Sequence, residues 1–290
     1  PGVSAASLTW GGRSIPAPGG LPAVAVSLTG PSLVHARAQA RTAIDAGADV
    51  LELRVDLLEE AGAPATFAPM DAGAAAARIL ECLREVGEVA DDADTDAVAP
   101  LLLTCRTAAE GGRAQLDDAA YGALLRSVLD GLACWAPERR PAAIDVEVER
   151  GCLRRVCEQA HGLGVDIVAS FHDFDTTPSD QVLEEVLARM ADEGADLAKI
   201  AVWPTGAADV ARLLGVCARA TADPEEGTGL GVPVAAMSMG ALGAVSRVAP
   251  AFGSALTFAV VPDEQGEARA SAPGQIPIQD VRRYLELLRA

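Results

Sequence analysis

The chain alternates eight short apolar segments with eight longer amphipathic ones, and this alternation constrains its fold more than any other feature. Short apolar runs bounded by Gly and Pro are typical of buried strands, and amphipathic segments are typical of surface helices. The predicted strands are residues 22–28, 49–56, 100–107, 142–148, 165–173, 196–203, 233–240 and 254–261. The predicted helices are residues 32–47, 72–88, 117–135, 150–162, 180–193, 206–221, 242–251 and 277–289. Such an alternation predicts a parallel sheet covered by helices.

Eight strand–helix units favour a single (β/α)8 TIM barrel, an α/β fold that closes its sheet and typically takes about 250 residues. A doubly wound open sheet would use fewer strands and would normally carry a Gly-rich phosphate turn. Neither the GxGxxG nor the GxxxxGK[ST] pattern occurs in the chain. We therefore expect one barrel domain over residues 21–290. Residues 1–20 are expected to form an arm in which SLTWGGRSI makes a β-hairpin that turns at Gly11–Gly12.

Charge and cysteine usage exclude several classes of partner. The formal net charge of −18 argues against nucleic acid or an anionic membrane surface, and no apolar run is long enough to span a membrane. None of the six cysteines forms a CxxC pair or has zinc-ligand spacing with a histidine. We expect a cytoplasmic protein with reduced thiols, without a metal, a nucleic-acid partner or a membrane partner. A site for an anionic substrate must then gather arginines locally.

Lys199 is the only lysine in the chain and lies in the apolar run DLAKIAVW. Burying a cationic amine is costly unless the amine is paired or deprotonated. Arginine can replace lysine in most surface roles, but it cannot form a Schiff base. Two interpretations follow from this stretch alone: a lysine that an Arg-rich composition left by chance at the wet end of a strand, or a lysine kept for its chemistry.

Other polar side chains gather at the ends of the predicted strands. In residues 49–56, Glu52, Arg54 and Asp56 share one face, which in a sheet covered by helices points into a site. The C-terminal rim of a barrel is where such folds place their sites. The residues that fall in the second half of a predicted strand, or just after it, are Glu52, Arg54, Arg106, His172, Lys199 and Met239.

The chemistry that such a set can perform is specific. A deprotonated lysine attacks a ketone or aldehyde to give an iminium, which acidifies the adjacent carbon. A neutral His172 could remove that carbon's proton. Glu110 could orient the imidazole, although a solvated loop carboxylate is an equally good interpretation. Arg54, Arg106 and Arg247 near the rim suggest an oxygen-rich anion as the substrate.

Six motifs occur in a fixed order between about residue 22 and the C-terminus. They are ELRVD, TCRTAAEGG, ASFHDF..TP, GADLAKIAV.P, SMG....SR and SAPGQI. Together they closely resemble those of the type I 3-dehydroquinate dehydratases, also called 3-dehydroquinases, which are Schiff-base enzymes of the shikimate pathway of aromatic amino acid biosynthesis. SLTWGGRSI also looks like the N-terminal hairpin of that family.

The resemblance implies a barrel enzyme that converts 3-dehydroquinate to 3-dehydroshikimate by syn elimination of water, without a metal or organic cofactor, and a homodimer. Lys199 would form the imine with the C3 ketone, and His172 would abstract a C2 proton and help to expel the C1 hydroxyl. Glu110 would be the carboxylate partner of the histidine, and Arg247 would hold the substrate carboxylate. The other implied substrate contacts are Ser27, Glu52, Arg54, Arg106, Met239, Ser271 and Gln275.

The same resemblance makes the SAPGQ segment a lid, in which Gly274 permits unusual backbone angles. The chain departs from the family pattern at Phe171 and in an acidic insertion at residues 91–96. The roles of Asp145 and Glu147 stay open, and either could support His172. Two alternatives also stay open: a class I aldolase, and a silent barrel that binds a carboxylate metabolite.

Overall fold

The computed structural model describes residues 6–59, 71–91, 99–223, 229–262 and 270–289. The acidic insertion lies mainly outside these ranges. Eight strands form one parallel sheet, and all eight predicted strands are confirmed. Their bounds are β3 Ala23–Leu28, β4 Val50–Arg54, β5 Leu101–Thr104, β6 Ala143–Glu147, β7 Asp166–Asp173, β8 Leu197–Val202, β9 Val234–Ser238 and β10 Leu256–Ala259.

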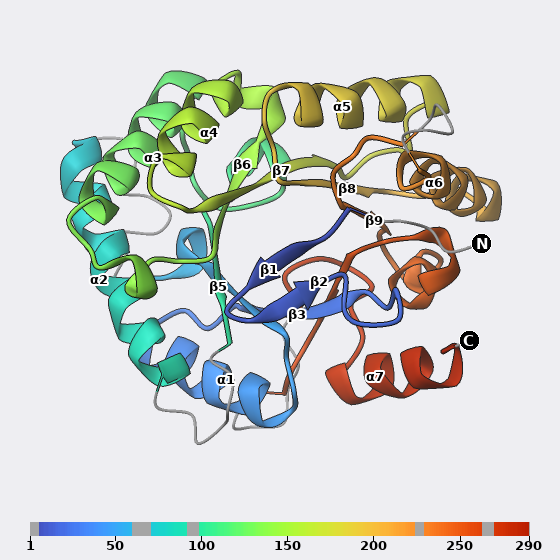
Figure 1. Cartoon of the computed structure of the whole chain (residues 1–290), viewed down its shortest axis with the longest axis horizontal. Coiled ribbons are helices and arrows are strands. Elements are labelled where there is room, and N and C mark those ends of the chain that lie inside the picture. The colour runs from blue at the N-terminus through green and yellow to red at the C-terminus, as the bar shows by residue number, and fades with distance from the viewer. Residues whose placement is uncertain (1–5, 60–70, 92–98, 224–228, 263–269, 290) are drawn as a thin grey trace.

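The sheet curls into a nearly closed barrel with the order β10-β3-β4-β5-β6-β7-β8-β9. Its two end strands adjoin where the Ala255 N–H, just before β10, donates to the carbonyl of Val234 in β9 at 2.7 Å. Figure 1 shows the helices arranged around the outside of this sheet. The fold is therefore the expected TIM barrel.

Seven α-helices cover the described part of the barrel. They are α1 Leu33–Asp45, α2 Ala72–Asp91, α3 Asp118–Leu132, α4 Leu153–His161, α5 Asp180–Asp192, α6 Ala207–Ala220 and α7 Ile278–Leu287. Ser32, Asp117 and Ser179 cap α1, α3 and α5, because each side chain accepts a hydrogen bond from a backbone N–H of the first turn. None of the helices in these ranges is both long and apolar enough to cross a membrane.

The seventh predicted helix, residues 242–251, is wrong. That segment forms two short 3-10 turns, η6 Ala244–Val248 and η7 Pro250–Phe252. A side chain at Gly243 would lie 2.3 Å from the carbonyl oxygen of Ser238, so the chain turns tightly against the end of β9 there. Pro250 and the left-handed Gly253, at φ +82°, then break any continuing helix.

Strand residues divide between an outer and an inner core. Leu51, Leu53 and Val55 pack outward in the large cluster under the helices, as their alternation predicted. Val50 belongs to a second cluster inside the barrel, and Glu52 is buried higher on the same inner face. Inner-facing polar side chains are therefore held at one end of the barrel, and inner-facing apolar ones at the other.

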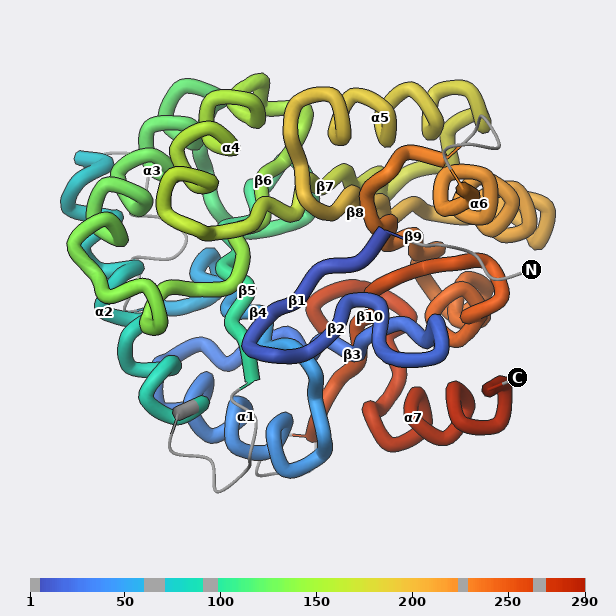
Figure 2. Tube along the Cα trace, in the orientation of Figure 1, coloured from blue at the N-terminus to red at the C-terminus, as the bar shows by residue number. Residues whose placement is uncertain are grey.

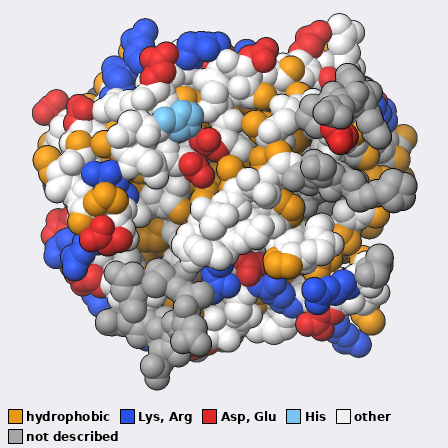
Figure 3. All heavy atoms as spheres, viewed as in Figure 1, with side chains coloured by type: hydrophobic (Ala, Val, Ile, Leu, Met, Phe, Trp, Pro, Cys, Tyr) orange, Lys and Arg blue, Asp and Glu red, His pale blue; other side chains and the backbone are white. Residues whose placement is uncertain are grey.

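The predicted N-terminal hairpin is present and plugs the apolar end of the barrel. Its strands are β1 Leu8–Trp10 and β2 Arg13–Ile15. Trp10 and Ile15 are buried in the inner cluster, and the Trp10 indole N–H donates to Asp166 at the start of β7 at 2.8 Å. Figure 2 shows the hairpin crossing in front of the barrel strands. Figure 3, viewed from the same side, shows atoms packed across the middle of this face.

No disulfide joins Cys105, Cys134, Cys152, Cys157 or Cys217 in the described part of the chain. Cys82, Cys105, Cys157 and Cys217 are buried and pack as small apolar side chains.

Candidate active site

A small cavity of about 40 Å³ lies at the carboxyl ends of the strands, opposite the hairpin. Its walls come from most of the strands and from the loops that follow them. The lining residues are Glu52, Arg106, Glu110, Gly111, His172, Phe174, Lys199, Ala201, Met237, Arg247, Phe258, Ser271, Ala272 and Gln275. Polar groups that are far apart in the sequence thus converge on one point, as expected for the C-terminal rim of a barrel.

Lys199 projects from β8 into this cavity and is almost fully buried. Its Nζ lies 3.4 Å from Asp145 Oδ2 and 3.9 Å from Glu52 Oε1. The same nitrogen lies 4.6 Å from the ring centroid of Phe258 in β10, a distance that allows a cation–π contact. The buried amine is therefore surrounded by groups that stabilise a positive charge on its nitrogen.

His172 lies on the neighbouring strand β7, where its backbone pairs with Ala201 two residues beyond Lys199. Its Nδ1 lies 2.8 Å from Glu110 Oε2, and its ring stacks on Phe174 with the centroids 6.5 Å apart. Burial lowers the pKa of His172 well below its ordinary value, and the nearby positive charges of Arg106 and Lys199 lower it further. The imidazole is therefore neutral near pH 7 and able to accept a proton.

Glu110 is held at the end of the short turn η2 Ala108–Glu110. Burial raises the pKa of its carboxyl group to about 8, although the Arg106 guanidinium opposes this rise. Its Oε1 has no hydrogen-bond partner among the described residues. Burial thus favours the uncharged forms of both Glu110 and His172.

Arg106 and Arg54 are each bound to carboxylates of the protein. Arg106 Nη2 donates to both oxygens of Asp145 at 2.9 Å, and its Nη1 donates to Glu147 at 3.2 Å. Arg54 makes two parallel hydrogen bonds of 2.8 Å to Asp56. Paired arginines of this kind have little charge left to attract a substrate anion.

Arg247 differs from the other two arginines because its contacts are uncharged. It lies in η6, is 2% exposed, and donates to the carbonyl oxygens of Phe258 at 3.5 Å and Pro273 at 3.2 Å. No carboxylate pairs with it among the described residues, and its Nε lacks a hydrogen-bond partner there. Burial lowers the pKa of Arg247 to about 10. A buried cation without a counter-ion is a ready site for an anion.

The lid segment, residues 271–275, lies over the cavity and is tied to the barrel. Gln275 Nε2 donates to Ser271 Oγ at 3.0 Å, Ser271 Oγ donates to Ser27 Oγ at 2.8 Å, and Ser27 Oγ donates to Glu52. The Gly240 N–H donates to the carbonyl of Pro273 at 3.0 Å. These hydrogen bonds hold residues 271–275 against the end of the barrel.

The cavity brings together most of the residues selected from the sequence. Those that line it are Glu52, Arg106, Glu110, His172, Lys199, Arg247, Ser271 and Gln275. Ser27 and Arg54 are outside the lining. Ser27 donates a hydrogen bond to Glu52, and Arg54 is bound to Asp56. Within the described residues, the methionine that lines the cavity is Met237, whereas Met239 is fully buried, follows the end of β9 and does not reach the lining.

Sequence reasoning missed several contacts of the cavity. Phe258 and Met237 face inward on β10 and β9, and the strand alternation that identified Glu52 could have identified them. The sequence left open whether Asp145 supports His172. In the structure Asp145 contacts Lys199 and Arg106, whereas the carboxylate that contacts His172 is that of Glu110. Among the described residues, no group of three or more His, Cys, Asp or Glu is placed to hold a metal ion.

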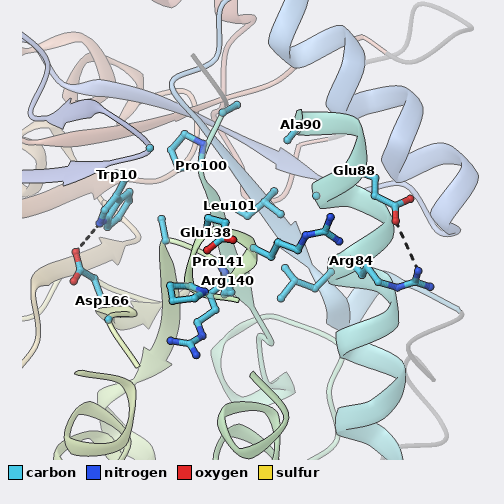
Figure 4. Close-up of a pocket in the computed structure, with 18 of the residues that line it drawn as sticks. Trp10, Arg84, Glu88, Ala90, Pro100, Leu101, Glu138, Arg140, Pro141 and Asp166 are labelled. Atoms are coloured by element: carbon cyan, nitrogen blue, oxygen red, sulfur yellow. Dashed lines mark hydrogen bonds and ion pairs between the residues drawn. The ribbon is translucent and has the colours of Figure 1, made fainter. Parts of the chain in front are cut away.

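A larger cavity of about 740 Å³ lies at the opposite end of the barrel, beside the hairpin (Figure 4). Its polar side chains are largely bound to protein groups. Trp10 bonds Asp166, Arg84 pairs with Glu88 at 3.7 Å, and Arg140 donates to three backbone carbonyls. The cavity at the carboxyl ends is smaller, but it holds the amine, the imidazole and the unpaired arginine.

The chain is similar to known proteins along nearly its whole length. Residues 24–290 match the type I 3-dehydroquinase family. The 3-dehydroquinate dehydratase of Klebsiella pneumoniae is 35% identical over 269 residues, which cover 91% of this chain and 92% of that protein. The structure of the 3-dehydroquinate dehydratase of Geobacillus kaustophilus superposes with a TM-score of 0.80 at 29% identity, covering 99% of this chain and 98% of that one. The type I enzyme of Clostridium difficile, solved with covalently modified comenic acid, gives a TM-score of 0.79 at 28% identity, with 98% of each chain covered. The chain therefore belongs to the type I 3-dehydroquinase family.

Proposed function

We propose that this chain dehydrates 3-dehydroquinate to 3-dehydroshikimate, as a hydro-lyase of the shikimate pathway, through an imine on Lys199. The family supports the reaction and favours it over aldol cleavage. The observation that carries the mechanism is the meeting of three groups in one cavity. They are the only lysine of the chain, a neutral histidine, and an arginine that no carboxylate of the described residues pairs with.

Lys199 attacks the C3 ketone of the substrate, and the carbonyl oxygen leaves as water. The resulting iminium withdraws electrons from the adjacent C2 and makes its proton removable. Glu110 engages His172 Nδ1, which leaves Nε2 as the ring nitrogen available to the substrate. His172 takes the C2 proton and then protonates the C1 hydroxyl as it departs. Hydrolysis of the product imine restores the free amine.

Arg247 binds the substrate carboxylate in this proposal. Its guanidinium is buried, and its hydrogen-bonding partners in the structure are uncharged. A bidentate contact with a carboxylate is the natural use of such a group. Glu52, Arg106, Ser271 and Gln275 then contact the hydroxyl groups of the ring, since all four line the same cavity.

The lid must open before the substrate enters. The cavity of about 40 Å³ lies far below the roughly 300–1,000 Å³ of a typical small-molecule site. A six-membered ring with a carboxylate needs several times the volume of this cavity. Opening the lid would remove the Pro273 carbonyl from Arg247, and the substrate carboxylate would take its place. Closure would then exclude water from the imine.

Trapping with borohydride tests this function. Treatment with 3-dehydroquinate and borohydride is expected to place a stable adduct on the peptide that contains Lys199 and to abolish activity. The matched variant Lys199→Arg keeps the positive charge beside Asp145 and Glu52, but it cannot form an imine. It should lose turnover by on the order of 10⁴-fold or more and give no adduct. Binding of 3-dehydroquinate by the wild-type chain without any adduct would refute the imine mechanism.

We further propose that residues 21–290 act as one catalytic domain behind the arm of residues 1–20, and that the chain works as a homodimer in the cytoplasm. The family match over residues 24–290 supports a single catalytic domain, and cysteines outside disulfides suit a reducing compartment. Sedimentation equilibrium of the full chain checks the oligomeric state, and a monomer at micromolar concentration would contradict the dimer.

A further inference from the structure

Asp145 links the reactive lysine to the most heavily paired arginine of the site. It lies on β6, is 1% exposed, and places Oδ2 3.4 Å from Lys199 Nζ. Both of its oxygens accept hydrogen bonds from Arg106 Nη2 at 2.9 Å, and Oδ1 also accepts from Ser170 at 2.7 Å. Ser170 is the backbone partner of Lys199 in the pairing of β7 with β8. Three neighbouring strands are thus joined through one carboxylate.

The charge on the lysine nitrogen explains why a fixed carboxylate is useful there. Condensation of the ammonium form with a ketone gives an iminium and water, so the nitrogen carries one positive charge before and after the step. Asp145 is the nearer of the two carboxylates that face this nitrogen, at 3.4 Å against 3.9 Å for Glu52. Glu52 is also engaged by hydroxyl donors from Ser27 and Thr104.

The surroundings of Asp145 keep it ionised. Burial alone would disfavour its charge, but the charges of Arg106 and Lys199 and the hydrogen bond from Ser170 lower its pKa below the ordinary value. The carboxylate is also fixed in orientation, because its oxygens accept hydrogen bonds from Arg106, just after β5, and from Ser170 in β7. It therefore presents a constant negative charge to the amine.

We propose that Asp145 is a positioning residue for Lys199, which holds the amine in place and stabilises the cationic nitrogen of the imine. The inference rests on the proposed function, because it assigns Asp145 a role in imine chemistry at Lys199. The other charged or titratable groups that face the same cavity are Glu52 from β4, Arg106 after β5, Glu110 from η2, His172 from β7 and Arg247 from η6. Among these groups and Asp145, the carboxylate closest to the nitrogen is that of Asp145.

Glu147 provides a matched control on the same strand. It is fully buried, lies on the same inward face two residues beyond Asp145, and pairs with Arg106 Nη1 at 3.2 Å. Its other contacts are with Thr107 and Arg150, and its N–H donates to the Tyr121 hydroxyl. Asp145→Asn and Glu147→Gln each remove one buried counter-ion of Arg106, but only the first removes a charge beside Lys199.

The experiment measures the pH dependence of carbamylation by cyanate, which reacts with unprotonated amines. Lys199 is the only lysine, so its peptide reports a single side chain. In Asp145→Asn, the midpoint of the pH profile is expected to move to lower pH by about one unit or more, because the ammonium form loses its nearest counter-charge. We also expect kcat to fall about 10- to 100-fold while KM changes less than threefold. In Glu147→Gln, the midpoint should stay within about 0.3 units of the wild type. Equal shifts in the two variants, or no shift in either, would overturn the inference.

Two serine variants test the same role of Asp145 if Asp145→Asn does not fold. Ser170→Ala removes the hydrogen bond that fixes Asp145 Oδ1 but leaves the ion pair with Arg106. It is expected to lower kcat at least about threefold with KM nearly constant. Ser238→Ala is the control, because that hydroxyl is equally buried and has no hydrogen-bond partner among the described residues. Equal kcat values for the two serine variants would refute the role of Asp145.

Failure of this inference can be told apart from failure of the proposed function. Cyanate labelling needs no substrate, whereas borohydride trapping needs 3-dehydroquinate. An adduct on Lys199 without a shift in the Asp145→Asn profile would refute only the role of Asp145. A shift without any adduct would refute the imine mechanism.

Discussion

The basic side chains of the cavity differ in whether a carboxylate lies beside them, and this difference suggests different roles. Lys199 faces Asp145 and Glu52, and Arg106 is bound to Asp145 and Glu147. Arg247 is buried with neutral partners. In a chain with a net charge of −18, a buried arginine that meets no carboxylate among the described residues would attract an anionic substrate locally.

Replacing Arg247 should therefore stabilise the empty protein while impairing substrate binding. In Arg247→Met, a side chain of similar length fills the site without a buried charge, and the free energy of unfolding is expected to rise by about 1 kcal/mol or more. KM for 3-dehydroquinate should rise at least about 100-fold, since a charge-assisted carboxylate contact is lost. Urea unfolding and steady-state kinetics measure the two effects.

Arg219→Met is the control for that change. Arg219 is 45% exposed and pairs with Glu184 and Asp180 on the surface, so its loss should lower stability by less than about 1 kcal/mol and leave KM unchanged. An Arg247→Met protein that is less stable than the wild type would show that its carbonyl contacts already satisfy the guanidinium.

The carboxyl group of Glu110 predicts a pH dependence of stability. Its pKa in the folded protein, about 8, lies above its ordinary value of 4.5, so the folded state holds this proton more tightly than the unfolded state. The resulting stabilisation is complete below pH 4.5 and is lost as the pH rises through about 8. Glu110→Gln cannot lose a proton there. Its stability relative to the wild type should therefore rise by roughly 3 kcal/mol between pH 5 and pH 8. Urea unfolding at several pH values checks this, and a constant difference would contradict it.

His172 changes the pH dependence of stability in the opposite direction, and its effect appears mainly at acidic pH. Its pKa is lowered by burial and by nearby positive charges, so its contribution to stability is lost as the pH falls below its ordinary value of 6.5. Both proteins keep His172, and its contribution largely cancels in the comparison. Together the two groups predict that the wild type is most stable at intermediate pH. Protonation of His172 destabilises it at lower pH, and ionisation of Glu110 destabilises it at higher pH.

At the scale of elements, the strands were predictable because each is a short apolar run between turn residues. The same pattern could not identify the turns at 244–248 and 250–252, where tight packing against β9 decides the conformation. Met239, which the family motif placed against the substrate ring, follows the end of β9 at Ser238 and lies outside the cavity lining, where Met237 lies instead. Pairing between charged side chains, such as Arg106 with Asp145, depends on side-chain directions that sequence spacing leaves open.

The lid depends on a glycine at its closest approach to the barrel. Gly274 has φ +82°, and a side chain there would lie 2.3 Å from the carbonyl oxygen of Gly240. Gly274→Ala is therefore expected to disfavour the closed lid, with a loss in kcat/KM of about 10-fold or more and little effect on global stability. Kinetics with 3-dehydroquinate and a thermal melt measure the two quantities.

Gly164→Ala is the control that distinguishes the cost of a positive φ from the cost of the contact with Gly240. Gly164 has a similar φ of +70°, but a side chain there would meet no atom within 4 Å. That variant should lose about 1 kcal/mol of stability and keep its kinetic constants. Equal losses in kcat/KM for the two glycine variants would show that closure does not depend on the contact with Gly240.

At the scale of the whole molecule, the groups that stabilise the fold and the groups of the candidate active site lie at opposite ends of the barrel. Ionisable groups that oppose folding when charged, such as Glu110 and Arg247, gather at the carboxyl ends of the strands. The other end is filled by apolar side chains and sealed by the hairpin, whose Trp10 and Ile15 are buried against the starts of the strands. The hairpin therefore contributes stability that offsets the cost of burying ionisable groups at the other end of the barrel.

Trp10→Ala is expected to lower the free energy of unfolding by about 3–5 kcal/mol, because it empties a large buried site in the inner core. Trp10→Phe keeps most of the buried area but removes the indole N–H that donates to Asp166, and should lower it by about 1 kcal/mol. In both variants kcat and KM should stay within about twofold of the wild type at temperatures where the protein is folded, since the hairpin lies at the far end of the barrel from Lys199. Lys199→Arg should show the reverse pattern, with activity lost and the melting temperature nearly unchanged. Thermal melts and kinetics on the four proteins would test this separation, and a large fall in kcat for Trp10→Phe would show that the two ends are energetically coupled.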